Sequence, residues 1–194
     1  MKKLIAIAVT GGIAGGVIFA QGTVSFQNFY QPILFAPDYL SDGTTKLSGP
    51  QYMAELLAGP SADTMTAIAT TSFFSGGSAG YFNGGTQTLP NVLGGATAFA
   101  QVDIWNTMLG ATFNSAKASG LPNAWAQSAV FPVVTGNPFV PSLPGVLTGL
   151  TPLSLNAVPE PSTLALAALG AAFLRFRIVQ LKRRSGSFFY SPKD

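Results

Sequence analysis

The sequence predicts a mainly β fold, a single antiparallel β-sandwich or jelly-roll-like domain, and three observations support this prediction. The body of the chain, residues 21–157, is rich in Gly, Thr, Ser, Ala and Phe and holds few charges. A soluble helical bundle needs charged faces, so this composition argues against one. Short segments alternate polar and apolar residues, which is the period of a half-buried strand. Clusters of Gly, Pro, Asn and Asp separate these segments and predict turns.

The expected strands follow from this alternation and from the turns that bound it. Residues 96–105 give the clearest strand, because alternate Ala, Val and Ile residues share one face. Residues 51–58 contain good helix formers, but Gly-Pro pairs on both sides keep the segment short and favour a strand. The sequence predicts strands at residues 23–27, 51–58, 64–71, 81–82, 96–105, 127–134 and 150–155, and one helical turn at 114–119 closed by Gly120.

Residues 1–20 have the layout of a secretory signal peptide. A positively charged start precedes the apolar residues 4–19, and Ala20 is a small residue before the expected cut between Ala20 and Gln21. An uncleaved membrane anchor is the alternative, because the glycines of this run repeat the Gly-x-x-x-Gly spacing of packed membrane helices. The short apolar run favours the cleaved signal peptide, so the mature domain is expected to begin at Gln21.

Most of the positive charges lie at the two ends of the chain. The whole sequence has a net charge of +3, whereas residues 21–157 hold two lysines against five carboxylates, a net charge of −3. No nucleic-acid partner is expected, because the body lacks a basic surface. The sequence has neither Cys nor His. It therefore offers no disulfide, no His general base and no His or Cys metal ligand, and neither a cofactor nor a metal is expected.

Three patterns in the body are weak signals for chemistry. Residues 76–80 match Gly-x-Ser-x-Gly, but a hydrolase elbow also needs a histidine and a following helix, so a glycine turn is the better interpretation. Residues 38–43 carry two carboxylates, fewer than a calcium loop supplies, and are interpreted as a turn. The third pattern is a carboxylate pair for hydrolysis, with Asp38, Asp42, Glu55, Asp63 and Asp103 as candidates.

No catalytic residue is assigned from these patterns. Glu55 and Asp103 have outward parity in their predicted strands, where a solvated charge is expected. Aromatic side chains give a candidate ligand surface instead: Trp105, Trp125 and Tyr81, together with Tyr52, are the residues that would stack on sugars. The alternative is that these rings fill the core, which the fifteen Phe residues of the chain favour.

The C-terminal segment carries the most specific pattern. It opens on Val158-Pro159-Glu160-Pro161-Ser162-Thr163, whose prolines cannot continue a helix, and residues 164–174 are apolar. A basic cluster follows, made of Arg175, Arg177, Lys182, Arg183 and Arg184. As a helix, residues 162–174 would rise about 20 Å, short of the ~30 Å hydrocarbon core, which suits a transient transmembrane helix better than a stable anchor.

This order of motif, apolar helix and basic cluster resembles the PEP-CTERM sorting signal of exported proteins of Gram-negative bacteria. The resemblance implies a sorting signal at residues 158–184 with a C-terminal transmembrane helix, and a cytoplasmic tail at 185–194. It also implies an exosortase, a membrane transpeptidase that cuts near the Pro-Glu-Pro after a transient stay in the inner membrane. Proteins of this family are associated with exopolysaccharide and biofilm matrix.

The sequence therefore predicts a non-enzymatic exported protein of the cell surface or extracellular matrix. The alternative is a carbohydrate-binding β-sandwich module whose partner is an extracellular polysaccharide, and a carboxylate-based hydrolase is a third interpretation. Exposed aromatic rings beside polar groups in a groove would favour sugar binding. Two carboxylates within reach of one another in a cleft would favour the enzyme.

Overall fold

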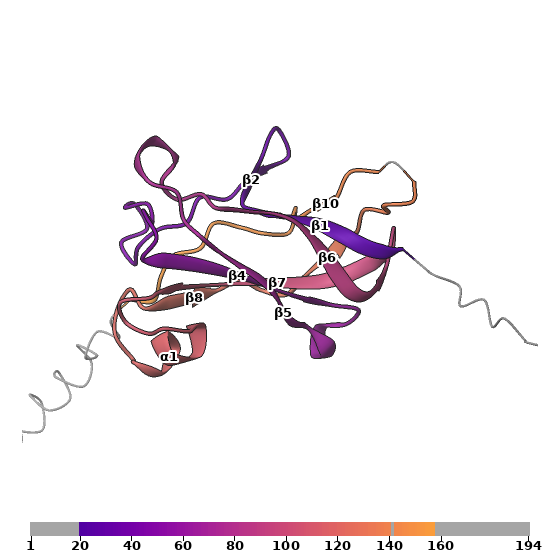
Figure 1. The fold of residues 1–194 in the computed structure, drawn as a ribbon. Helices are drawn as coiled ribbons and strands as arrows, with labels where there is room; N and C mark the ends of the chain where they lie inside the picture. Colours follow the sequence, from indigo (N-terminus) through magenta and orange to yellow (C-terminus); the bar gives the residue numbers. More distant parts are fainter. Residues whose placement is uncertain (1–19, 141, 158–194) are drawn as a thin grey trace, which may run out of the picture. The chain divides into compact units, whose positions relative to one another are not determined.

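The computed structural model describes residues 20–140 and 142–157 (Figure 1). By its internal contacts the chain divides into two units, Met1–Asn156 and Ala157–Asp194. The signal segment before Ala20, the sorting signal at 158–184 and the tail at 185–194 lie outside the described residues. Within the described part, no helix combines the length and the apolar character that a membrane crossing needs.

The described part of the chain is mainly β, as predicted. Its strands are β1 (Gln21–Gln27), β2 (Phe29–Tyr30), β3 (Leu34–Phe35), β4 (Tyr52–Gly59), β5 (Thr66–Ser72), β6 (Asn83–Leu93), β7 (Thr97–Asn106), β8 (Trp125–Gln127), β9 (Phe131–Val134) and β10 (Gly145–Val146). Its helical elements are the 3-10 turns η1 (Ala62–Thr64) and η2 (Gly76–Ser78) and the helix α1 (Phe113–Ala118).

Two larger sheets and one hairpin organise these strands (Figure 1). One sheet has the order β10-β1-β6, and the other has the order β5-β4-β7-β8 with β9 also paired to β7. The strands β2 and β3 form the hairpin. The pairs of the five-stranded sheet are all antiparallel, but β1 and β10 run parallel. The prediction of a wholly antiparallel domain is therefore wrong at the β10 edge.

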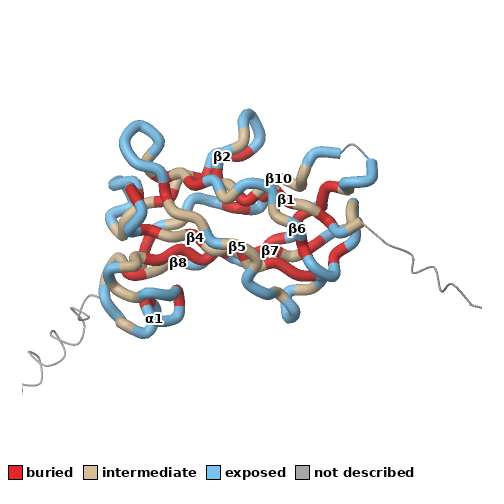
Figure 2. The backbone as a smooth tube through the Cα atoms, in the orientation of Figure 1, coloured by how far each residue is buried: buried red, intermediate tan, exposed pale blue. Residues whose placement is uncertain are grey.

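One hydrophobic core is shared by the two larger sheets. Alternate residues of the central strands are fully buried, as expected for strands with one face on a core. From β1, β4 and β7 these residues are Val24, Phe26, Ala54, Leu56, Ala98, Ala100, Val102 and Ile104. Figure 2 shows the buried residues concentrated between the layers, with exposed residues on the loops. Burial of each larger side chain contributes about 1.5–3 kcal/mol, so the fold can be stable without disulfides.

The longest strand, β6, was not predicted from the sequence. The pair Gly84 and Gly85 signals a turn, but it lies in a bulge of β6, where Gly85 has a φ of 76° and the pairing with β1 shifts register. The strand predicted at residues 81–82 is wrong, because only Phe82 forms a bridge, with Phe73. Gly84 and Gly85 therefore lie inside β6, where pairing with β1 continues on both sides of the bulge.

The C-terminal part of the domain also differs from prediction. The strand predicted at residues 150–155 is wrong: only Ser154 forms a bridge, with Tyr39. The segment predicted as one strand at 127–134 is two strands, β8 and β9, which pair with different halves of β7. The strands predicted at residues 23–27, 51–58, 64–71 and 96–105 are confirmed by β1, β4, β5 and β7.

The helix α1 packs against one end of the five-stranded sheet. Thr112 caps its first turn, since the Ser115 N–H donates to Thr112 Oγ1 at 3.2 Å. Gly120, with a φ of 65°, follows its last turn, and this confirms the helical turn predicted there. The buried residues Phe113 and Ala116 form a second hydrophobic cluster with two residues of the sheet side, Trp105 and Ala124.

Residues 147–156, named here the C-terminal strap, run back along the N-terminal half of the domain. The Tyr39 N–H donates to Leu153 O at 2.8 Å, and the Leu155 N–H donates to Tyr39 O at 3.0 Å. Asn156 Oδ1 accepts from the N–H groups of Ala124 and Trp125 at 2.8 and 2.9 Å. The strap is therefore bonded into the domain up to Asn156.

Candidate functional site

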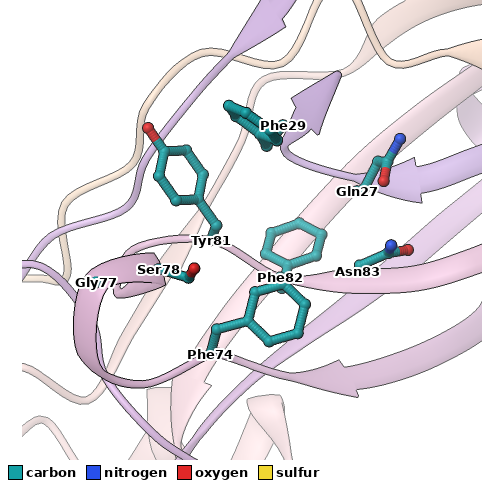
Figure 3. Close-up of a pocket in the computed structure, with 8 residues that line it drawn as sticks. All are labelled: Gln27, Phe29, Phe74, Gly77, Ser78, Tyr81, Phe82 and Asn83. Atoms are coloured by element: carbon teal, nitrogen blue, oxygen red, sulfur yellow. The ribbon is translucent and has the colours of Figure 1, made fainter. Parts of the chain in front are cut away.

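A pocket of about 260 Å³ lies where β1 ends, beside the segment that joins β5 to β6 (Figure 3). Its lining is largely aromatic and includes amide and hydroxyl side chains: Gln27, Phe29, Phe74, Gly77, Ser78, Tyr81, Phe82 and Asn83. In Figure 3, Gln27 and Asn83 lie on one side and Ser78 and Tyr81 on the other, with the Phe rings between them. The lining contains no Asp, Glu, Lys or Arg.

One wall of the pocket is the Gly-x-Ser-x-Gly segment. Gly76 and Gly80 have φ values of 65° and 87°, a region of backbone conformation that glycine adopts most easily. A Cβ on Gly80 would also come within 3.3 Å of Asp38 O. The segment continues through Phe82 into β6, a strand, whereas a nucleophile elbow is followed by a helix. The interpretation as a glycine turn is thus confirmed, and Ser78 is a lining residue of the pocket.

Asn28 anchors the pocket from behind. It is fully buried, and its Nδ2 donates to Ala36 O at 2.8 Å and to Gly80 O at 2.9 Å. Its Oδ1 accepts from the Phe82 N–H at 2.9 Å. Phe82 forms the floor of the pocket and packs edge-on against Phe73 at 5.3 Å between ring centroids. One side chain therefore fixes both the end of the glycine turn and the floor.

Asp38 is the second buried polar residue of this region. Its Oδ1 accepts from the Leu153 N–H at 2.8 Å, and its Oδ2 lies 3.1 Å from Asn28 Nδ2. Burial raises the pKa of Asp38 from 3.8 to about 8, against the opposing effect of the hydrogen bonds from Leu153 and Asn28. Asp38 thus links the C-terminal strap to Asn28, and its burial favours the protonated carboxyl.

The free energy of unfolding is expected to fall as the pH rises from about 4 to about 8. The unfolded chain releases the Asp38 proton near pH 3.8 and the folded domain only near pH 8, so a rising pH in this window favours the unfolded chain. The limiting slope is about 1.4 kcal/mol per pH unit. Urea unfolding at several pH values measures the slope. Between pH 6 and 8, above the pKa of about 6 of the buried Asp103, Asp38→Asn should flatten the slope, whereas Asp63→Asn at an exposed site should not. Equal slopes in all three proteins in this range would contradict the assignment.

The other carboxylates lie outside the pocket. Asp42 bonds within its own turn, accepting from the N–H groups of Thr44 and Thr45 at 2.8 Å each. The predicted turn is therefore confirmed around Asp42, whereas Tyr39 forms bridges with Lys46 and Ser154. The Thr45 hydroxyl and these N–H groups lower the pKa of Asp42 to about 2. With Asp38 buried behind the pocket, the two carboxylates of this segment are engaged with different protein partners.

Glu55 and Asp103 lie directly opposite each other on β4 and β7. The expectation of a solvated charge is wrong for Asp103, which is 3% exposed and accepts from Gln127 Nε2 at 2.8 Å. Burial raises the pKa of Asp103 to about 6; the Gln127 hydrogen bond and Lys117 lower it, and Glu55 raises it. Burial also raises the pKa of Glu55. The pair shares a sheet face but does not line the pocket.

The three predicted aromatic residues lie in different places. Tyr81 lines the pocket, and its ring centroid is 5.1 Å from that of Phe29. Trp105 is 5% exposed and packs in the second hydrophobic cluster, so it is a core residue and does not face a ligand. Trp125 is half-buried, and Lys117 Nζ lies 4.6 Å from its ring centroid. Tyr81 is therefore the member of the predicted set that the pocket contains.

Five lining residues belong to no motif or residue set that the sequence singled out: Gln27, Phe29, Phe74, Phe82 and Asn83. Phe29 and Phe74 are 38% and 45% exposed, whereas Phe82, on the floor of the pocket, is almost completely buried. Both stand next to breaks in the alternating pattern, at the end of β1 and before the glycine turn. A large apolar residue beside such a break is the signal that could have pointed to them.

The fold and the C-terminal segment together define a class, a mainly β domain followed by a sorting signal. Residues 157–184 match the family model described as the PEP-CTERM protein-sorting motif. The chain thus carries a PEP-CTERM sorting motif, which indicates an exported protein that an exosortase sorts, and this confirms the resemblance of the C-terminal segment. Comparisons with curated proteins and with solved structures found no match. The matched segment holds Val158–Thr163 and the basic cluster, outside the described residues.

Proposed function

We propose that residues 21–157 form the mature part of a non-enzymatic protein of the cell surface or extracellular matrix. The observation that carries this proposal is the sorting motif at residues 157–184. The charges of the domain fit a structural or adhesive role: its two buried carboxylates, Asp38 and Asp103, are hydrogen-bonded to protein groups, and its pocket lacks acids and bases. A sandwich-like domain with this lining is better suited to contact than to acid–base chemistry.

The positions of the domain ends support two processing steps. β1 begins at Gln21, the residue after the expected signal cut, and Ala20 contributes a single backbone bond, accepting from the Gly94 N–H at 2.8 Å. At the other end, the strap is bonded up to Asn156, just before the sorting motif. Cuts after Ala20 and near Pro161 would therefore leave the core and almost every described hydrogen bond intact.

The proposed route follows from these ends. The signal peptide directs export, the apolar helix and basic cluster hold the chain transiently in the inner membrane, and the exosortase then cuts near the Pro-Glu-Pro. The domain is released to the cell surface or extracellular space. The basic residues remain with the removed segment, so residues 21–157 keep their net charge of −3, and a chain cut after Pro161 has a net charge of −4 because it also holds Glu160.

The intact mass of the released protein tests this proposal. We expect a chain that begins at Gln21 and ends near Pro161, purified from the medium or the cell surface of a producer that has an exosortase. The same chain made in a host without an exosortase is the control, and it should keep its C-terminal segment. A released protein that retains the basic cluster would contradict the proposed cut, and one that retains Met1 would contradict the signal peptide.

A further inference from the structure

We infer that the aromatic pocket binds one ring of a neutral sugar. The lining combines ring surface with amide and hydroxyl groups and has no Asp, Glu, Lys or Arg. Sugar rings present both apolar C–H faces and hydroxyl groups that donate and accept, so they need this mixture. This inference goes beyond the sorting role and does not depend on where the domain is finally held.

The exposed rings of the pocket are the first argument. Phe29 and Phe74 are 38% and 45% exposed, so part of each ring is open to a ligand. Phe29 is held between two rings, with centroid distances of 5.2 Å to Phe35 and 5.1 Å to Tyr81. These edge contacts fix the orientation of Phe29 while part of its surface stays open, as a stacking surface for a ligand requires.

The polar side chains are the second argument. Among the described residues, the Gln27 amide and the Ser78 hydroxyl make no hydrogen bond. Asn83 Oδ1 accepts from the Gly85 N–H at 2.8 Å, which turns the Asn83 amide and leaves Nδ2 free to donate. The free groups lie on opposite sides of the rings (Figure 3). A ring seated on the Phe surface could therefore be bonded from both sides.

The charge and size of the pocket limit the class of ligand that it can bind. Lys46 Nζ lies 5.4 Å from the Tyr81 ring centroid, so the nearby cation already interacts with the outer part of the wall. With no ion among the lining residues, nothing inside favours an acidic sugar over a neutral one. A volume of about 260 Å³ is just below the ~300–1,000 Å³ typical of drug-sized ligands, which suits a single ring.

The rigidity of the site supports binding without rearrangement. Phe82 is 1% exposed and packs between Phe26 and Phe73, with ring centroids 5.1 and 5.3 Å away. Its N–H is held by Asn28, so the floor is fixed before any ligand arrives. A preformed site loses less conformational entropy on binding than one that must be ordered.

An apolar peptide side chain is the competing ligand for exposed aromatic rings. It would cover the amides of Gln27 and Asn83 and the hydroxyl of Ser78 without offering them partners. Each such group left unpaired weakens binding by about fivefold or more. The polar groups therefore favour a sugar over an apolar peptide.

The test is a titration of the purified full chain with neutral disaccharides (cellobiose, maltose, lactose and mannobiose), followed by ligand-observed NMR and calorimetry. We expect at least one to bind in the millimolar range or tighter. Phe74→Ala and Tyr81→Ala should each weaken that binding between about threefold and tenfold, and Gln27→Ala should weaken it similarly. Trp125→Ala, a half-buried ring outside the pocket, is the matched control and should bind as the unchanged protein does.

Four results would overturn the inference. They are the absence of binding by every neutral disaccharide, tighter binding of digalacturonic acid than of any neutral sugar, equal losses in Trp125→Ala and Phe74→Ala, and binding of an apolar tetrapeptide where no sugar binds. Circular dichroism of each variant separates loss of binding from loss of fold, because Phe74 is exposed and its truncation should leave the core intact. If Phe74→Ala does unfold, Ser78→Ala, which removes one lining hydroxyl only, decides the question, and unchanged sugar binding by that variant would overturn the inference.

Discussion

Replacing Asn28 by leucine is expected to lower the free energy of unfolding by about 4 kcal/mol, the largest loss for one side chain outside the apolar core. The change leaves Ala36 O and the Phe82 N–H without their buried partner. It also removes one of the two hydrogen bonds that Gly80 O accepts, the other coming from the Asp38 N–H. Each buried group that loses its hydrogen bond destabilises the fold by roughly 1–3 kcal/mol. Since a domain of this size has only about 5–15 kcal/mol in total, the variant should be close to unfolding at ordinary temperature.

Urea unfolding followed by tryptophan fluorescence measures this effect. The control is Asn114→Leu on the exposed side of α1, where a surface change should alter stability by no more than about 0.5 kcal/mol. If Asn28→Leu and Asn114→Leu unfolded at the same urea concentration, Asn28 would have no special role. The disaccharide titration is a second readout, because loss of the Phe82 N–H bond should also disturb the floor of the pocket.

Changing Pro159, Glu160 and Pro161 together to alanine is expected to keep the protein in the inner membrane fraction. Prolines on both sides of Glu160 prevent a helix from extending through the motif, whereas three alanines favour its continuation. We expect an exosortase to cut a helical motif less readily than a non-helical one. We expect release to fall at least about tenfold, equivalent to about 1.4 kcal/mol in the barrier to cleavage.

Fractionation of the producing cells, with immunoblotting of membrane and medium, measures this result. The matched control is Pro152→Ala, because Pro152 is an exposed proline a few residues before the motif. The control should be released normally. Normal release of the triple variant would remove the sorting role from the motif, and poor release of both proteins would show that the strap, not the motif, had been disturbed.

Local periodicity was enough to predict the strands that form the middle of the core. In β4 and β7 every second residue is small or branched and apolar, so burial of one face follows directly from the sequence. The strand β6 could not be predicted in the same way, because its glycines act through the bulge opposite β1. The strand predicted at residues 150–155 is absent because Leu150, Leu153 and Leu155 pack on the core individually, without a continuous ladder of strand hydrogen bonds.

The pocket was predictable only in part, because its residues come from segments far apart in the sequence. Tyr81 drew notice as an aromatic residue beside glycines, but nothing local links it to Phe29 or Gln27. The joining element is Asn28, whose amide reaches Gly80 across 52 positions of sequence. Trp105 was predicted as a ligand-facing ring, but α1 covers it, a contact that the sequence around Trp105 does not indicate. Contacts between residues so far apart in the sequence can be identified only from the three-dimensional fold.

The strap and the β1–β10 pair set a condition on how the chain folds during export. The hydrogen bond that Asp38 Oδ1 accepts requires the Leu153 N–H, 115 positions later in the sequence. The pairing of β1 with β10 likewise requires Gly145. Contacts of such high sequence separation form slowly, since the intervening chain must close first. A chain crossing the membrane from its N-terminus therefore cannot finish folding until nearly the whole domain has been translocated.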